Sequence, residues 1–370
     1  MYIVLDLYCG VGGFSLGFKQ EGYKVYGIDI NPEYLSVYRK YIGLAIQHDL
    51  SKVIYYDEED HHGELGVKNP DSIMALNWKF EKIGLRSDID VIIGGSPCEP
   101  FSRVNTLRRM EDHPLFPTMP NFFFMVWEIL PKVFIYENVP EVTRSPYFWY
   151  WIDELRYSIY TKTGYDIVIG IVDYSKYGIP LKRKRLFVIG SRTGFDGFNL
   201  SSMRETPPNL KQVIGDLVDH EYDFYIDHVW PRANTEVPKR RRVWKDYWNF
   251  DYFGKKLKWN ELPSGLVNIS KAYIMHPNHD RLLSVRETMR IFTFPDNFRI
   301  LNLISSLRNK YQAVIQAVPP KFSRKLARAI IPLLERDPHD KEEGDLVILD
   351  SWIKGLYNEI DWDKFLSLHA

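Results

Sequence analysis

One cysteine in this chain of 370 residues is placed where its thiol could act as a nucleophile. Residues 90–102 begin as an apolar run, break at a Gly-Gly pair and present Cys98 on a turn between Pro97 and Pro100. The prolines restrict the backbone on either side of the sulfur, at the end of a predicted strand. A cysteine is also a common small core residue, so the turn alone leaves that interpretation open.

Three acidic residues, Asp29, Asp49 and Glu137, each follow an apolar run of strand length. The carboxyl ends of parallel strands share one edge of a sheet, so we expect these acids on the rim that carries Cys98. Asp29 and Asp49 would suit an adenosine, one binding ribose hydroxyls and the other the exocyclic amine. Glu137 could protonate a reacting ring or form a hydrogen bond to it. Each acid could instead be a helix cap or a satisfied polar residue.

A glycine-rich turn joins a strand predicted over residues 2–7 to a helix predicted over residues 15–21. A strand, a tight turn and a helix in this order are typical of folds that bind a nucleotide or nucleoside at the turn. Ser15 stands where a dinucleotide fingerprint has its third glycine, so a nucleoside without phosphates is favoured over a pyrophosphate cofactor. The alternative is a turn that only packs the helix on the strand.

Several polar segments could contact a substrate. Arg183 and Arg185 alternate with period two at the start of an apolar run, so both would point to one face of a strand. Residues 238–248 mix a basic run with aromatic residues, a composition suited to phosphate contacts and stacking. Segment 103–121 is long for a connection and is predicted to be an active-site loop. A solvated charged surface is the alternative for both basic groups.

Composition limits the class of protein. The chain has 48 basic and 48 acidic residues, so any polyanion must be bound by a local patch. Two cysteines cannot build a disulfide framework, and no stretch has the length and apolarity of a membrane span. We therefore expect a cytoplasmic protein with no membrane association. The acidic and histidine cluster at residues 57–62 has no recognisable ligand spacing, and we expect no metal.

Six sequence elements, in this order, resemble those of the cytosine-5 DNA methyltransferase family. They are residues 7–13 (Leu-Tyr-Cys-Gly-Val-Gly-Gly), 96–102 (Ser-Pro-Cys-Glu-Pro-Phe-Ser), 137–139 (Glu-Asn-Val), the pair Arg183 and Arg185, 281–298, and 317–320 (Ala-Val-Pro-Pro). The resemblance covers residues 1 to about 192 and 259 to about 335. No single element is specific, but six in order with plausible spacing identify the family.

The resemblance implies a covalent mechanism. The family adds a thiolate to C6 of cytosine, which makes C5 a nucleophile for the methyl group of S-adenosylmethionine. By this similarity Cys98 is the thiolate, and Glu137 holds the N3 and amino edge of the base. Arg185 would contact O2, while Arg183 supports the cysteine side of the pocket. The base must be flipped out of the duplex, with segment 103–121 as the clamp.

The resemblance also implies two sets of contact residues. The residues expected to bind the cofactor are Tyr8, Gly10, Gly12, Gly13, Asp29, Asp49, Pro97, Gln316 and Val318. The residues expected to contact double-stranded DNA are Ser102, Arg103, Lys239, Arg240, Arg241 and Arg242. Within the first set, Asp29 would bind the ribose, Asp49 the adenine amine, and Pro97 would pack on the ring.

The chain departs from the family pattern at three places. Glu99 and Leu181 each stand where the family usually has glutamine, and Ile315-Gln316 replaces a usual Gly-Asn. A carboxylate at position 99 would lie close to a DNA phosphate. These departures bear on rate and cofactor affinity rather than on the reaction.

The expected fold is α/β, with a Rossmann-like, mostly parallel methyltransferase sheet and a smaller irregular target-recognition domain. We expect the catalytic and cofactor-binding domain over residues 1–192 and the target-recognition region over 193–300, with a variable part at 193–258. Helices over residues 301–370 would return to the first domain. In that last segment, helical spacing is predicted from residue 346, and the extra tail after 338 is expected to pack on the large domain.

The predicted function is methylation of cytosine C5 in a short specific double-stranded DNA sequence by a monomer. A restriction-modification or host-protection role would imply a cognate endonuclease as partner. The alternative is a tRNA cytosine-5 methyltransferase, but that branch is expected to carry a Cys-Phe-Thr element, and no cysteine follows Cys98. A catalytically silent DNA-binding protein is less favoured because Cys98, Glu137 and both arginines are present.

Overall fold

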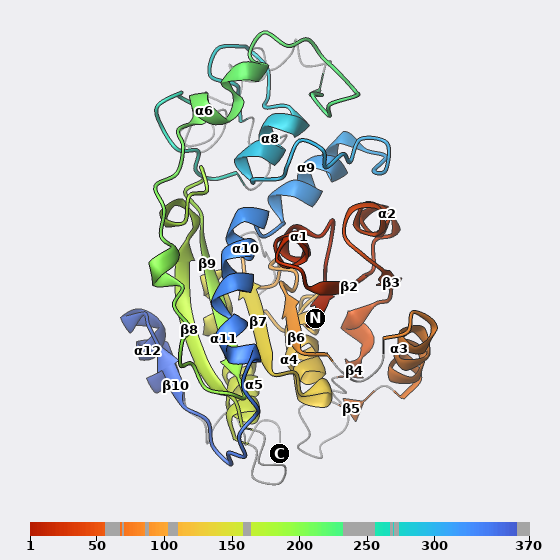
Figure 1. Ribbon diagram of the computed structural model, residues 1–370, viewed down its shortest axis with the longest axis vertical. Coiled ribbons are helices and arrows are strands. Elements are labelled where there is room, and N and C mark those ends of the chain that lie inside the picture. Colours follow the sequence, from red (N-terminus) through yellow and green to blue (C-terminus); the bar gives the residue numbers. More distant parts are fainter. Residues whose placement is uncertain are drawn as a thin grey trace.

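The computed structural model describes residues 1–55, 67–68, 70–85, 89–102, 110–157, 164–231, 256–266, 269 and 274–360. Its centre is a sheet with the strand order β10-β8-β9-β7-β6-β1-β2-β3 (Figure 1). The strands are β1 Ile3–Leu7, β2 Lys24–Asp29, β3 Ala45–Gln47, β6 Val91–Gly94, β7 Val133–Asn138, β8 Asp166–Asp173, β9 Lys184–Ser191 and β10 Leu346–Ile348. A separate antiparallel pair consists of β4 Ile54–Tyr55 and β5 Val67–Lys68.

Within this sheet only β9 runs against its neighbours, pairing antiparallel with both β7 and β8. The strands β3, β2, β1, β6 and β7 are paired in parallel, and β10 is parallel to β8. The residues of β6 and β7 are buried along their whole length, as expected for strands covered on both faces. The predicted α/β fold with a mostly parallel sheet is confirmed.

Helices cover both faces of the sheet. Their bounds are α1 Gly13–Gln20, α2 Pro32–Tyr41, α3 Pro70–Lys82, α4 Thr118–Ile129, α5 Pro146–Arg156, α6 Leu210–Ile214, α8 Val285–Ile291, α9 Leu307–Ile315, α10 Pro320–Ala329, α11 Ile331–Leu334 and α12 Ser351–Asn358. The apolar faces of α1, α2 and α10 share one hydrophobic cluster with the sheet, and those of α4, α5 and α12 share the cluster on the other face. Among the described residues, no helix is long and apolar enough to cross a membrane.

Helix α4 begins at Thr118, inside the segment 103–121 that was predicted to be a loop. Pro120 does not prevent this because the first amides of a helix have no intrahelical acceptor to lose. The predicted loop 103–121 is therefore wrong over residues 118–121, which belong to helix α4. Residues 110–117 form tight turns, with the amide of Phe116 donating to the carbonyl of His113 at 2.8 Å. Residues 103–109 lie outside the described part of the chain.

The helical spacing expected from residue 346 is wrong at its start, because residues 346–348 form strand β10 at the edge of the sheet. Leu346 pairs with Ile167 of β8, and the carboxylate of Asp350 accepts a bond from the amide of Ile171 at 2.8 Å. Val-Ile sequences favour the pleated backbone, and the free edge of β8 offers partners for it. The tail helix, α12, begins only at Ser351.

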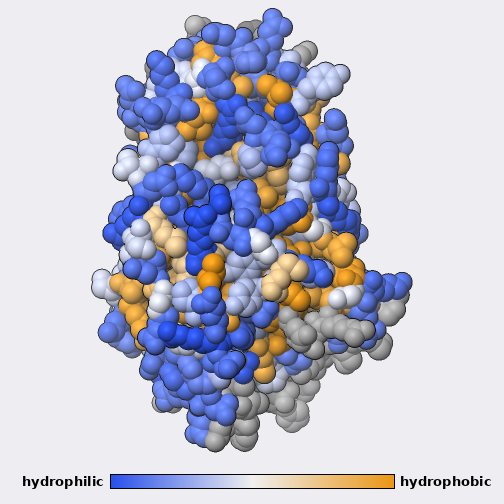
Figure 2. Space-filling model, viewed as in Figure 1, coloured by the Kyte–Doolittle hydropathy of each residue, from blue (hydrophilic) through white to orange (hydrophobic). Residues whose placement is uncertain are grey.

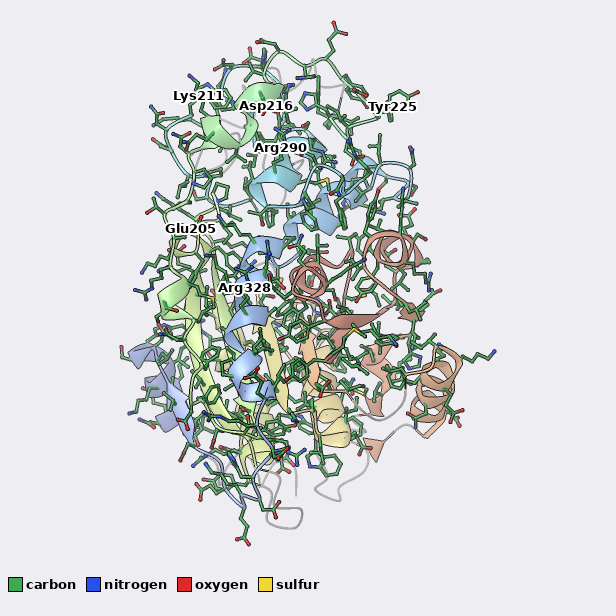
Figure 3. The ribbon with its side chains drawn as sticks, in the orientation of Figure 1. Glu205, Lys211, Asp216, Tyr225, Arg290 and Arg328 are labelled. Atoms are coloured by element: carbon green, nitrogen blue, oxygen red, sulfur yellow. The ribbon has the colours of Figure 1, made fainter. Side chains whose placement is uncertain are left out.

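Residues 206–231, 256–266 and 274–306, which we name the α6–α8 region, lie beyond the carboxyl end of the sheet (Figure 1). Arg290 of α8 binds Asp216 at 2.6 Å and Asp296 at 2.7 Å, and thereby ties α8 to the segment after α6 (Figure 3). Hydrophilic residues cover much of this region on the face seen in Figure 2, with smaller apolar patches between them. The domain division at residues 192 and 300 stays a prediction.

Candidate active site

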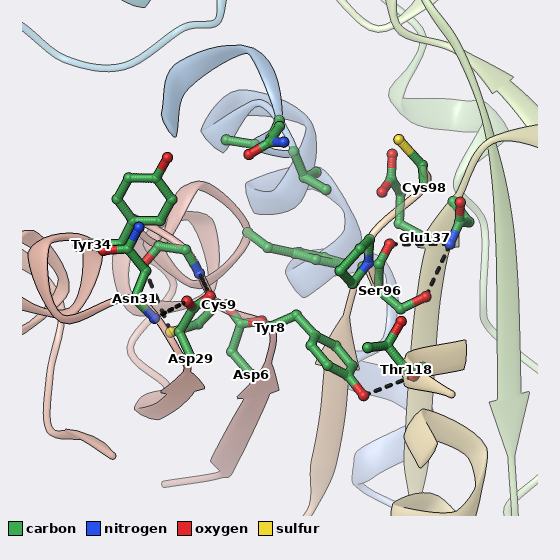
Figure 4. Close-up of a pocket in the computed structure, with 18 of the residues that line it drawn as sticks. Asp6, Tyr8, Cys9, Asp29, Asn31, Tyr34, Ser96, Cys98, Thr118 and Glu137 are labelled. Atoms are coloured by element: carbon green, nitrogen blue, oxygen red, sulfur yellow. Dashed lines mark hydrogen bonds between the residues drawn. The ribbon is translucent and has the colours of Figure 1, made fainter. Parts of the chain in front are cut away.

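The carboxyl ends of β1, β2, β6 and β7 open into one cavity of about 330 Å³ (Figure 4). Cys98 and Glu137 appear at one end of this view, and Asp29, Asn31 and Tyr34 at the other. The cavity is also lined by the end of α9 and the segment that follows it, residues 313–318. At the sheet edge predicted from the strand ends, a single cavity is therefore lined both by the thiol of Cys98 and by a set of acidic side chains.

The glycine turn after β1 needs unusual backbone geometry. Tyr8 has φ 62° and Gly10 φ 53°, both in the left-handed region that favours glycine. Gly13 approaches the segment after α9 closely, since a Cβ on it would lie 2.6 Å from the carbonyl oxygen of Val318. Gly12 does not line the cavity. A Cβ on Gly12 would collide with the side chain of Ile42, the residue that follows helix α2. Its contribution is to the turn and not to the cavity wall.

Asp29 holds the turn in place. Its carboxylate accepts one hydrogen bond from the amide of Gly10 and another from the amide of Asn31, both at 2.8 Å. Burial raises the pKa of Asp29, while these amide bonds lower it. Each carboxylate oxygen can accept a further bond, so Asp29 still has acceptor capacity for a hydroxyl in the cavity.

The remaining residues expected to bind the cofactor lie around the same cavity. Those that line it are Tyr8, Gly10, Gly13, Asp29, Asp49, Pro97, Gln316 and Val318. Ile30, which sequence reasoning missed, is 59% exposed and lines the cavity beside Asp29. The set therefore offers carboxylates for hydroxyl or amine groups and apolar side chains for a flat ring, which fits a nucleoside.

The surroundings of Asp6 also bear on whether the cavity fits S-adenosylmethionine. It is 1% exposed, lines the cavity, and receives a hydrogen bond from the hydroxyl of Ser15 at 2.6 Å. Burial raises the pKa of Asp6 to about 8, and no basic side chain of the described residues forms an ion pair with it. A cation bound in the cavity, such as the sulfonium of S-adenosylmethionine, would lower this pKa and favour the ionised carboxylate.

Cys98 begins a tight turn in which its carbonyl accepts bonds from the amides of Phe101 and Ser102. The thiol is half-buried and faces the cavity. Burial raises the pKa of Cys98, the neighbouring Glu99 raises it further, and Arg185 opposes both. Ser102 does not line the cavity, and its hydroxyl donates to the carbonyl of Glu99 at 3.3 Å.

Glu137 and Arg185 form a direct pair, with Nε of the arginine 3.1 Å from Oε1 of the glutamate. The hydroxyl of buried Tyr174 lies 3.5 Å from the same oxygen. Burial raises the pKa of Glu137, while Arg185 and then Arg183 lower it. The net direction favours the protonated carboxyl, which can donate a hydrogen bond to a ring nitrogen.

Arg183 lies on the cavity wall beside this pair. Its Nη1 donates to the carbonyl of Leu266 at 3.4 Å, and its guanidinium lies over the ring of Phe292. Burial lowers the pKa of Arg183 to about 10, and its buried Nε has no hydrogen-bond partner among the described residues. The guanidinium is therefore a positive charge held at the cavity wall with one donor unsatisfied.

Some of the expected residues lie outside the part of the chain that the structure describes. Arg103, Lys239, Arg240, Arg241, Arg242 and the cluster at 57–62 lie outside the described residues. Within the described ranges, no group of histidine, cysteine and acidic residues could hold a metal ion. Leu181, one of the departures, is fully buried and does not line the cavity.

Sequence reasoning assigned no role to several polar residues at or beside the cavity, and Asp6, Ser96, Tyr136 and Tyr174 are among them. Ser96 lies two residues before Cys98, and Tyr136 directly precedes Glu137, so their positions in the motifs were the available signal. Asp6 and Tyr174 are side chains that only the folded chain brings to the site.

A thiol, a buried acid and two arginines next to a nucleoside-shaped recess suit covalent group transfer to a heterocyclic base. The profile of the C-5 cytosine-specific DNA methylase family matches residues 2–332, nearly the whole chain. This chain belongs to the C-5 cytosine-specific DNA methylase family. It is therefore a DNA cytosine-5 methyltransferase, which favours the predicted function over the tRNA alternative and over a silent DNA-binding protein.

Relatives of this DNA methylase include prokaryotic type II methyltransferases. It is 27% identical to the putative type II methyltransferase M.MjaORF1200P of Methanocaldococcus jannaschii, covering 88% of this chain and 97% of the relative. It is 24% identical to the type II methyltransferase M1.HphI of Haemophilus parahaemolyticus, covering 89% and 86%.

Two solved structures support the fold. A putative DNA modification methyltransferase encoded within a prophage of E. coli has a TM-score of 0.60 at 22% identity, covering 91% of this chain and 100% of that one. The Dnmt2 methyltransferase of S. pombe has a TM-score of 0.57 at 15% identity, covering 90% and 99%.

Proposed function

We propose that this DNA methylase methylates a flipped-out cytosine in a short specific double-stranded sequence, with Cys98 as the nucleophile. The observation that carries the proposal is the shared cavity, in which Cys98 and Glu137 lie on neighbouring strand ends beside the acids and glycine turn. A base that enters this cavity must leave the duplex, because the reacting edge of a stacked cytosine is inaccessible.

The covalent steps follow from the side chains. Cys98 loses its proton, and its sulfur forms a bond to C6 of the cytosine. The electron pair displaced from the C5–C6 bond is stabilised by Glu137, which donates a proton or a hydrogen bond at N3. Arg185 contacts O2, and Arg183 stabilises the thiolate side of the cavity. After C5 has gained the methyl group it loses its proton to water, and the C5–H electron pair re-forms the C5–C6 double bond. The C6–sulfur bond breaks in the same step to release Cys98 as a thiolate, and Glu137 takes back any proton that it gave to N3.

S-adenosylmethionine supplies an electrophilic methyl group when it is bound. The residues proposed to hold it are Tyr8, Gly10, Gly13, Asp29, Asp49, Pro97, Gln316 and Val318, with Gly12 acting through the turn. Asp29 takes the ribose hydroxyls, while Pro97 packs on the ring system. Asp6, without a cation of its own, supports a positively charged ligand at the glycine turn.

DNA contacts are proposed at Ser102 and Arg103, which follow Cys98 in the sequence, and at the basic run Lys239, Arg240, Arg241 and Arg242. Neutral net charge makes such local clusters necessary for binding a polyanion. The names of the curated relatives, type II methyltransferases, support a restriction-modification role with a cognate endonuclease. Residues 193–300 are proposed as the target-recognition region, and the protein as a monomer.

Bisulfite sequencing of DNA from cells that express the protein tests this function. We expect unconverted cytosines at one short sequence on the genome, and full conversion in cells that carry Cys98→Ser. Conversion of every cytosine in cells with abundant soluble protein would contradict DNA methylation. Sequencing of bisulfite-treated small RNA from the same cells tests the tRNA alternative, which predicts protected cytosines there instead.

A further inference from the structure

The ends of β6 and β7 carry a polar network on the face of the sheet opposite to Glu137. The two strands are parallel, and Gly94 is paired with Tyr136. Continuing this register by two residues places Ser96 beside Asn138. Side chains alternate along a strand, so Tyr136 and Asn138 share one face while Glu137 points to the other.

Three side chains meet in this network. The hydroxyl of Tyr136 bonds the hydroxyl of Ser96 at 2.8 Å and accepts a bond from Nδ2 of Asn138 at 2.7 Å. The same Nδ2 lies 3.1 Å from the Ser96 hydroxyl and 3.2 Å from the Ser96 carbonyl oxygen. The oxygen of the Asn138 amide accepts from the amide of Val139 at 2.8 Å. The polar atoms of all three side chains are thus bonded to one another or to the backbone.

The network is buried, with Tyr136 fully excluded from solvent and Ser96 only 4% exposed. Burial raises the pKa of Tyr136, so its hydroxyl stays protonated and can both donate and accept. Buried hydrogen bonds in a connected network strengthen one another and hold one geometry. The two strand ends are therefore joined by side chains as well as by the β-ladder, which ends at Gly94 on β6.

On the opposite face of β6 and β7, the spacing of the two strand ends determines where Glu137 lies relative to Cys98. A Cβ on Gly95 would lie 2.8 Å from Oε2 of Glu137, so the glutamate fits against position 95 with little room. Its other oxygen is held by Arg185 at 3.1 Å. Cys98 lies only two residues beyond Ser96. A shift between the two strand ends would therefore change the spacing of Glu137 and the thiol together.

We propose that Tyr136 is a positioning residue for methyl transfer, acting with Ser96 and Asn138 to fix the Cys98 turn relative to Glu137. The phenol does not reach the cavity and touches no reacting atom. Misplacement of reacting groups by about 1 Å can lower a rate by about 100-fold. The inference rests on the proposed roles of Cys98 and Glu137, and it extends them to a residue behind the sheet.

The test compares Tyr136→Phe with Tyr165→Phe. Each change removes one buried hydroxyl, and that of Tyr165 donates to the carbonyl of Pro131 at 2.7 Å, near the amino ends of β7 and β8. Methyl transfer and formation of the covalent adduct with a 5-fluorocytosine duplex are measured in single turnover, together with thermal unfolding and S-adenosylhomocysteine binding. We expect similar losses of thermal stability. Only Tyr136→Phe should slow adduct formation, by about tenfold, with cofactor binding within about twofold of wild type.

Ser96→Ala and the double variant Ser96→Ala/Tyr136→Phe extend the test. Because the two hydroxyls act as one unit, the double variant should lose no more rate than the larger of the single losses. Adduct formation in Tyr136→Phe as fast as in Tyr165→Phe, or rate losses that multiply in the double variant, would overturn the inference. If Tyr136→Phe does not fold, an unchanged rate in Ser96→Ala would overturn it as well. An inactive wild type would instead contradict the proposed function.

Discussion

At the scale of single residues, the charge next to the thiol sets how readily Cys98 ionises. Burial is the largest cause of the raised pKa of Cys98. Among the neighbouring charges, Glu99 raises this pKa most and Arg185 lowers it most. In Glu99→Gln the pKa of the thiol should fall, so more thiolate is present at neutral pH. We expect single-turnover methyl transfer near pH 7 to become a few-fold faster, with the same plateau at alkaline pH. A pH profile that does not move would show that Glu99 does not control the nucleophile.

Asp29 is the residue on which the cofactor assignment depends most. Asp29→Asn keeps the shape of the side chain and an acceptor for one of the two amides, but it removes the charge. Charge-assisted hydrogen bonds contribute about 1.5–3 kcal/mol, so the dissociation constant for S-adenosylhomocysteine should rise by about 10- to 100-fold. Isothermal titration measures this, with DNA affinity as the control that should stay constant. Unchanged cofactor binding would refute the role.

At the scale of elements, one buried ion pair organises the α6–α8 region. Asp227 has φ 58°, accepts from the amides of Ile300 and Leu301, and binds Arg286 at 2.8 Å. Both charged side chains are 1% exposed. Asp227→Asn leaves the buried arginine with only its longer contact to Asp296 at 3.8 Å, and removal of one partner of a buried pair costs about 3–5 kcal/mol.

Urea unfolding tests this loss against Lys258→Ala, which removes an exposed pair with Glu261 and should cost at most about 1 kcal/mol. The double variant Asp227→Asn/Arg286→Met should be more stable than Asp227→Asn alone, because it carries no unpaired charge. Equal stability of Asp227→Asn and wild type would show that the pair does not hold these elements together.

The sequence predicted the elements whose signals are local. The strand ends that carry Asp29 and Glu137, the glycine turn and the turn at Cys98 all lie at the predicted edge of the sheet. The start of α4 was missed because Pro120 resembles a helix boundary unless its place in the first turn is known. Strand β10 was missed because its partner, β8, lies about 180 residues earlier in the chain.

The site was predictable as a list of residues but not as a set of contacts. The motifs contain Glu137 and Arg185, yet only the antiparallel pairing of β7 with β9 brings them within 3.1 Å. Asp6 lies within an apolar strand, and the burial of Tyr174 beside Glu137 depends on packing against Phe322, which is distant in sequence. Long-range packing of this kind leaves no local pattern in a single sequence.

At the scale of the whole molecule, neutral net charge makes DNA affinity depend on local clusters. For Lys239, Arg240, Arg241 and Arg242, each lost phosphate contact should reduce the log–log salt slope by about 0.9 and weaken cognate and scrambled duplexes alike. A lost base contact should cost about 1–3 kcal/mol for the cognate duplex only. Single alanine variants, titrated at several salt concentrations, separate the two. No change in affinity or slope for any variant would place recognition elsewhere.

A covalent bond between Cys98 and C6 of the cytosine can be trapped and located in the chain. A cognate duplex with 5-fluorocytosine at the methylated position is incubated with the protein and S-adenosylmethionine, and the trapped complex is digested and analysed by mass spectrometry. Fluorine at C5 cannot leave as a proton does, so the adduct persists. We expect an adduct on the peptide that contains Cys98. Cys98→Ser should form no adduct but should still bind S-adenosylhomocysteine. An adduct on another residue, or methylation by Cys98→Ser within about tenfold of wild type, would contradict it.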